Sequence, residues 1–163
     1  MDRMKKILFI AICGTVLISC DKKIPAPPSF ISATINGTGY TVNQQMTIAR
    51  LRQPNDSTES FSIYGIDGNA NYLEVDLLSK NNLKDSTYIF AKDSSQLIKV
   101  VFQPAGGDSY STAYTAANPS SITITYVDTV STIRGTFTGV LYENGDTTQS
   151  SKTITNGNFT LMN

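Results

Sequence analysis

Phe30-Ile31-Ser32-Ala33-Thr34-Ile35-Asn36-Gly37-Thr38-Gly39-Tyr40 is the most informative stretch of this chain for its architecture. Apolar and hydroxyl side chains alternate up to Ile35, as in a strand with one buried face. Asn36-Gly37 then predicts a type I′ hairpin turn, because both central residues of that turn need a positive φ. We expect the returning strand over Tyr40–Ile48.

The β-type pattern continues to the end of the chain, and no amphipathic helix is indicated. Arg50-Leu51-Arg52 is interpreted as a brief turn that Pro54 ends. Gly135 and Gly139 stand four apart in one expected strand, and such glycines mark bulges or close backbone approach. The further expected strands are Phe61–Tyr64, Tyr72–Leu78, Ser86–Ala91, Leu97–Gln103, Ser109–Ala117, Ile122–Val127, Ile133–Tyr142 and Ile154–Met162. The pattern predicts an all-β fold, an antiparallel β-sandwich of about nine or ten short strands, with a small β-barrel as the alternative.

The N-terminus has the parts of a secretory leader. Basic residues precede the apolar run Ile7–Ile18, which is shorter than the roughly 20 residues that a membrane-spanning helix needs. Leu17-Ile18-Ser19-Cys20 resembles the bacterial lipobox, in which the Cys thiol is diacylated and the leader is removed. We therefore expect a signal peptide over 1–19, acylated Cys20 and a Pro-rich tether over 20–28, and one β-domain over 29–163.

Composition excludes several kinds of chemistry. The chain has no His, and its two cysteines are Cys13 in the leader and Cys20 at the expected lipid site. His-based nucleophile systems, His-based metal sites and disulfides are therefore excluded from the mature chain. Removal of the leader leaves ten basic and twelve acidic side chains, which gives no electrostatic footprint for nucleic acid. We predict no cofactor and no metal.

Three candidate sites use the remaining chemistry. Glu74 and Asp76 share a strand face, roughly 6–7 Å apart by strand rise, which would suit a glycosidase acid/base pair; the alternative is a solvated face. Asp67, Asn69 and Asn71 have the spacing of the first ligands of a calcium-binding loop. The residues at the later positions of that loop do not match the pattern, so a hairpin turn is the better explanation of these three residues. A Ser/Lys dyad has no supporting motif; its candidates are Ser86, Ser94 and Ser109.

Surface residues suggest two further features. The tyrosines either line a carbohydrate-binding face or sit half-buried at strand edges; they are Tyr40, Tyr64, Tyr72, Tyr88, Tyr110, Tyr114, Tyr126 and Tyr142. Asp-Ser and Asp-Thr pairs resemble the acceptor motif of Bacteroidota protein O-glycosylation, although such pairs also open turns. The candidate acceptors are Ser57, Ser86, Thr129 and Thr147. Intact-mass analysis that finds only acyl additions would exclude this modification.

The lipobox, the tether and the start Phe30–Gly37 together resemble a large family of small Bacteroidota lipoproteins with a β-rich domain of unknown function. Further motifs agree: Leu83–Tyr88, Ile133–Phe137 and Ile154–Phe159. Two departures concern local turns, since Lys84-Asp85 replaces the usual Pro-Gly and Tyr40 stands where Trp is common. The resemblance implies no catalytic residue.

The sequence therefore predicts a lipid-anchored lipoprotein of the cell envelope, and a non-catalytic binding or accessory module. The alternatives are an envelope hydrolase with a carboxylate pair and a purely structural component. Its partners would be the membrane, through lipid at Cys20, and an unidentified envelope protein or glycan. In Bacteroidota, the phylum of the family that this chain resembles, an acidic run after the lipidated Cys marks lipoproteins that are exported to the cell surface. Because Lys22-Lys23 follow here, we expect the periplasm-facing side of the outer membrane.

Overall fold

The computed structural model describes residues 29–42, 47–55, 58–81, 83–90, 96–113, 115, 120–128 and 132–162. Cys20, Ser57, Ser94, Thr129 and the tether lie outside these ranges. Eleven strands follow one another: β1 (Phe30–Ile35), β2 (Thr38–Val42), β3 (Thr47–Asn55), β4 (Thr58–Ile66), β5 (Tyr72–Ser79), β6 (Ser86–Ile89), β7 (Gln96–Gln103), β8 (Tyr110–Thr112), β9 (Ser121–Asp128), β10 (Thr132–Glu143) and β11 (Ser151–Met162). The described residues contain no helix of the length and hydrophobicity that crossing a membrane requires.

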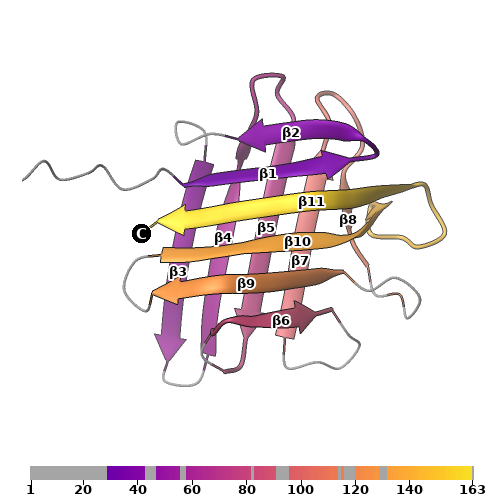
Figure 1. Cartoon of the computed structure of the whole chain (residues 1–163). Helices are drawn as coiled ribbons and strands as arrows, with labels where there is room; N and C mark the ends of the chain where they lie inside the picture. Colours follow the sequence, from indigo (N-terminus) through magenta and orange to yellow (C-terminus); the bar gives the residue numbers. More distant parts are fainter. Residues whose placement is uncertain are drawn as a thin grey trace, which may run out of the picture.

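The strands form two packed layers, and every pairing is antiparallel, so the predicted all-β fold is confirmed. One layer has the order β2-β1-β11-β10-β9-β6, and the other has β8-β7-β5-β4-β3. The strands of the first layer cross those of the second (Figure 1). The layers are continuous, because β10 pairs with β9 along its first half and with β8 at its end. The result is a sandwich whose single sheet is nearly closed and barrel-like.

The predicted hairpin turn is confirmed. Asn36 and Gly37 have φ values of 47° and 82°, and they join β1 to β2. The Asn36 side chain also accepts a hydrogen bond from Thr153 N at 2.8 Å, which fixes the turn against β11. The interpretation of Arg50–Arg52 as a turn is wrong: these residues lie inside β3, paired with β4. A β-sheet edge tolerates Pro54, which lacks an N–H donor.

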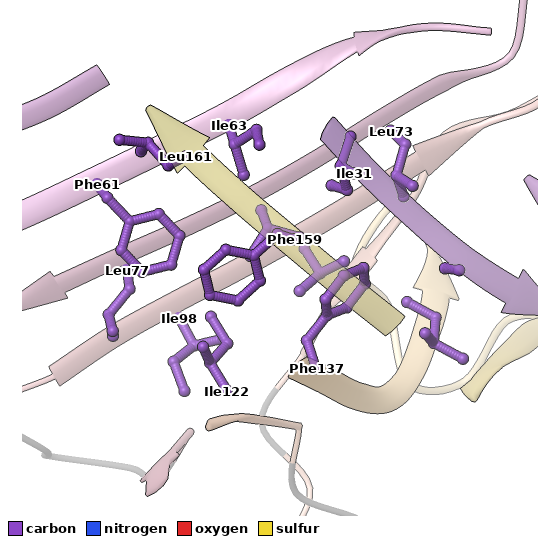
Figure 2. Close-up of a cluster of buried hydrophobic side chains, with 14 of the residues drawn as sticks. Ile31, Phe61, Ile63, Leu73, Leu77, Ile98, Ile122, Phe137, Phe159 and Leu161 are labelled. Carbon is purple, nitrogen blue, oxygen red and sulfur yellow. The ribbon is translucent and has the colours of Figure 1, made fainter. Parts of the chain in front are cut away.

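The core lies between the layers and is filled by alternate side chains of both (Figure 2). Leu73, Val75 and Leu77 of β5 are buried, as their alternation predicts. Four phenylalanines are fully buried: Phe61, Phe102, Phe137 and Phe159. Phe61 and Phe159, from opposite layers, stack with ring centroids 5.0 Å apart. These rings fill the part of the interior where the two layers face each other.

Glycines allow the first layer to pack closely. A Cβ at Gly135 would lie 2.2 Å from Thr123 O and 2.7 Å from the Phe159 ring, and a Cβ at Gly139 would lie 2.3 Å from Ser120 Oγ. The pairing register shifts beside both residues, so the predicted bulges and close approach are both present. The bulge at Gly139 comes just before the part of β10 that pairs with β8 of the other layer, and bulges increase the bend of a strand.

We expect Gly135→Ala to lower the free energy of unfolding by about 1–3 kcal/mol or more, because the backbone carbonyl of Thr123 cannot move away cheaply. Gly39→Ala is the matched control, since a Cβ there meets nothing within 4 Å and Gly39 is exposed in β2. Urea denaturation followed by circular dichroism measures both. Equal stability of the two variants would contradict the close approach at Gly135.

The outer face of the first layer is dominated by hydroxyl and amide side chains. One row crosses the whole layer, each residue paired in register with the next: Thr87, Thr123, Thr136, Asn158, Ser32 and Thr41. Thr87 Oγ1 and Thr123 Oγ1 share a hydrogen bond of 3.0 Å. Such cross-strand Thr pairs stabilise a sheet, and this face differs sharply from the outer face of the second layer.

Candidate functional site

The outer face of β4, β5 and β7 gathers ionisable and aromatic side chains. Alternation turns Glu74 and Asp76 of β5 away from the core, as the sequence predicts. The register sets Ser62 of β4 and Lys99 of β7 on either side of Asp76, and Tyr64 beside Glu74. We call these residues, together with Tyr72, the β5 cluster.

One ammonium group holds both carboxylates. Lys99 Nζ donates to Glu74 Oε1 and Oε2, each at 3.1 Å, and lies 3.9 Å from Asp76 Oδ2. Ser62 Oγ donates to Asp76 Oδ1 at 2.5 Å. A glycosidase pair keeps its two carboxylates free on either side of a scissile bond. Here the Glu74 carboxylate is engaged by Lys99, so the predicted pair shares a face but lacks that arrangement.

Burial perturbs the titration of the β5 cluster. Desolvation raises the pKa of Asp76 to about 6; the Ser62 hydrogen bond opposes this, Glu74 adds to it, and Lys99 opposes it. Desolvation, with the charge and hydrogen bond of Glu74, also raises the pKa of the Tyr72 hydroxyl. At neutral pH the cluster therefore holds a costly negative charge at Asp76.

This charge predicts a pH dependence of stability. Because the folded-state pKa of Asp76 is raised, its stabilising contribution is present at low pH and is lost as the pH rises through about 6. We expect the melting temperature of the native chain to rise when the pH is lowered from 7.5 to 5. Asp76→Asn should remove this rise, and the amide oxygen of the new side chain can still accept the hydrogen bond from Ser62. Asp67, whose pKa is lowered by hydrogen bonds from Asn71 and Asn69 that outweigh desolvation, titrates below this window. Identical pH profiles of the two proteins, measured by scanning calorimetry, would contradict the assignment.

Two open depressions flank the β5 cluster along the strands. The first, of about 380 Å³, includes Ser62, Asp76 and Lys99 in its lining and reaches Leu78 and Leu97. The second, also about 380 Å³, is lined by Tyr72, Ile66, Gln103 and the turn 104–106. Leu97 is 54% exposed, and Leu78, with which it pairs, is 39% exposed. Three polar residues of the cluster thus line one partly apolar hollow, and Tyr72 lines the other.

Tyr64 and Tyr72 form the aromatic part of the cluster, with ring centroids 6.2 Å apart and planes inclined by 44°. Three other described tyrosines have contacts elsewhere. Tyr40 packs on Phe102, Tyr88 is buried with its hydroxyl donating to Lys84 O, and Tyr110 lies under the Lys152 ammonium. Tyr114 and the side chain of Tyr126 lie outside what the structure describes. The tyrosines placed above therefore form no single face, although Tyr64 and Tyr72 meet at the site.

The other candidates do not join this site. Asp67 Oδ1 accepts hydrogen bonds from Asn69 N and from the backbone and side chain of Asn71, which is the predicted turn and leaves that oxygen occupied. Among the described residues, no three His, Cys, Asp or Glu side chains form a group that could hold a metal ion. Ser86 is half-buried in β6, Ser109 is half-buried before β8, and Thr147 is exposed between β10 and β11.

Comparison with known protein families, with curated proteins and with solved structures finds no match to this chain. The geometry of the outer face therefore carries the functional argument by itself.

Proposed function

We propose that this chain is a lipid-anchored lipoprotein of the bacterial cell envelope, and that it acts as a non-catalytic binding module through the outer face of β4, β5 and β7. The observation that carries the proposal is the β5 cluster between its two depressions. The leader and Cys20 support the anchor. A single acyl chain would bind a membrane only marginally, so the two or three acyl groups of a lipoprotein suit stable attachment.

The position of the domain's N-terminal end suits this role. Ser29 Oγ accepts a hydrogen bond from Met162 N at 2.9 Å, which ties residue 29 to the end of β11 in the first layer. The β5 cluster belongs to β4, β5 and β7 of the second layer (Figure 1), and strand alternation turns its side chains away from the core. A tether that leaves from the first layer keeps the proposed binding face away from its own point of attachment.

The second candidate function is an envelope hydrolase, and the raised pKa of Asp76 is the observation that favours it. Two features favour binding instead: Lys99 engages the Glu74 carboxylate, and both depressions open to solvent. General acid/base work needs a second carboxylate free to act on a water or a bond. We therefore prefer binding without turnover.

The remaining parts of the proposal concern place and modification. A periplasm-facing position on the outer membrane follows from Lys22-Lys23, and nucleic acid is not an expected partner. O-glycosylation stays a proposal for Ser57, Ser86, Thr129 and Thr147. Of the two that the structure describes, the exposed Thr147 is the more accessible acceptor.

Site-specific photocrosslinking in living cells tests the binding face. Leu97 at the first depression and Ile89 on the other layer are matched probes, because they are 54% and 49% exposed. A photoreactive residue at Leu97 is expected to capture one discrete envelope component, and the same residue at Ile89 is expected to capture none. Equal labelling from both positions, or none from Leu97, would overturn the proposed face.

A further inference from the structure

We infer that the ligand of the β5 cluster is a neutral, hydroxyl-rich glycan chain, lying along β5 from the Leu97 depression to the Tyr72 depression. This inference rests on the proposed function and names its ligand class. It is carried by the kinds of groups that the face offers and by the way the backbone around them is paired.

The cluster presents donors and acceptors side by side. Sugar hydroxyls both donate and accept hydrogen bonds, so they need carboxylate oxygens and N–H or O–H donors in one place. Asp76 and Glu74 supply the acceptors, and Lys99 and Ser62 supply the donors. Their mutual contacts hold these side chains in place before a ligand arrives, which lowers the entropic cost of binding.

The tyrosines supply the apolar half of sugar recognition. A pyranose ring has a face of C–H groups, and aromatic rings with a polar tip bind such amphipathic surfaces. Tyr64 and Tyr72 lie next to Glu74, so ring faces and carboxylate oxygens occur together. The inclination of the rings and the two separate hollows suit successive units of a chain rather than one enclosed small molecule.

Other ligand classes fit this face less well. An extended peptide that adds a strand needs an unpaired sheet edge, but β5, which carries Tyr72, Glu74 and Asp76, is paired with β4 and β7 along its whole length. A phosphate or a polyanion needs excess positive charge, whereas the described side chains of the cluster offer two carboxylates to one ammonium group. In the backbone register Arg50 and Arg52 of β3 are opposite Ser62 and Ser60, beside the cluster. The side chains of the cluster itself carry no excess positive charge, and they suit an uncharged polar ligand.

Affinity electrophoresis of the full chain in non-ionic detergent tests the ligand class. The gels contain hydroxyethyl cellulose, xylan, mannan or dextran as neutral probes, and polygalacturonate or chitosan as charged ones. We expect at least one neutral polysaccharide to retard the native chain. Tyr72→Ala and Tyr64→Ala should each weaken this binding about tenfold, which corresponds to about 1.4 kcal/mol. Ile89→Ala is the control and should bind normally, and Tyr72→Phe guards against a folding defect.

Each outcome decides the inference. Retardation that both Tyr→Ala variants lose and Ile89→Ala keeps supports it. Retardation by a charged polysaccharide alone, by none of the probes, or equally in all variants overturns it. If no neutral probe binds while a photoreactive residue at Leu97 still captures a protein, the glycan is wrong and the binding face stands. If Leu97 captures nothing and no probe binds, both fail.

Discussion

We expect Phe159→Ala to lower the free energy of unfolding by about 3–5 kcal/mol, the usual cost of emptying a phenylalanine site in a core. Phe159 is fully buried, stacks on Phe61 of the opposite layer, and lies against the backbone of Gly135. Nothing nearby can fill the space, because Gly135 has no side chain and the strands are fixed by their ladders. Residues 29–162 contain no cysteine, so no disulfide within them compensates. Urea denaturation followed by circular dichroism measures the loss.

The control for this prediction is Phe30→Ala. Phe30 pairs with Thr160 at the start of β1 and is only half-buried, so its removal should cost well under half as much. For a domain of this size total stability is about 5–15 kcal/mol, and the Phe159 variant should therefore be partly unfolded near its growth temperature. Equal losses for the two variants would show that the interlayer stack does not hold the sandwich together.

The second large effect concerns the anchor. We expect Cys20→Ser to remove acylation completely and to move the protein from washed outer membranes to the soluble fraction. The reason is that no other part of the proposal supplies a hydrophobic attachment, and each buried methylene of an acyl chain contributes about 0.8 kcal/mol. Labelled palmitate incorporation and cell fractionation measure the change.

Cys13→Ser is the matched control for the anchor. Cys13 lies inside the expected leader and not at the proposed lipid site, so this variant should still be acylated and membrane-bound. A Cys20→Ser protein that continues to pellet with washed outer membranes would defeat the assignment of Cys20 as the lipid site.

The sequence predicted those parts of the fold that depend on local chemistry. Asn36-Gly37 requires positive φ wherever it occurs between two strands, and the burial of Leu73, Val75 and Leu77 follows from strand geometry alone. The prediction of a turn at Arg50–Arg52 was wrong. Local composition carries no information about the hydrogen-bonded pairing with β4, which holds these residues in an extended conformation.

The candidate site was predictable only in part. Glu74 and Asp76 could be placed on one outer face by alternation, but their partner Lys99 could not be named. Consecutive strands are usually neighbours, which would have put β6 beside β5. In the structure β6 lies in the first layer and β7 pairs with β5, so Lys99 reaches both carboxylates. The pairing of β5 with β7 instead of β6 depends on the tertiary structure, and no short sequence motif indicates it.

Hydroxyl-radical footprinting tests whether the outer face of β4, β5 and β7 is covered by a ligand in the envelope. The measurement compares side-chain oxidation in native membranes with that of the detergent-extracted chain. Leu97 and Ile89 serve as the matched pair, because their exposed fractions are similar and they lie on different layers. We predict that Leu97, Tyr64 and Tyr72 are protected in native membranes while Ile89 is oxidised equally in both states. Equal oxidation of Leu97 in the two preparations would contradict the account.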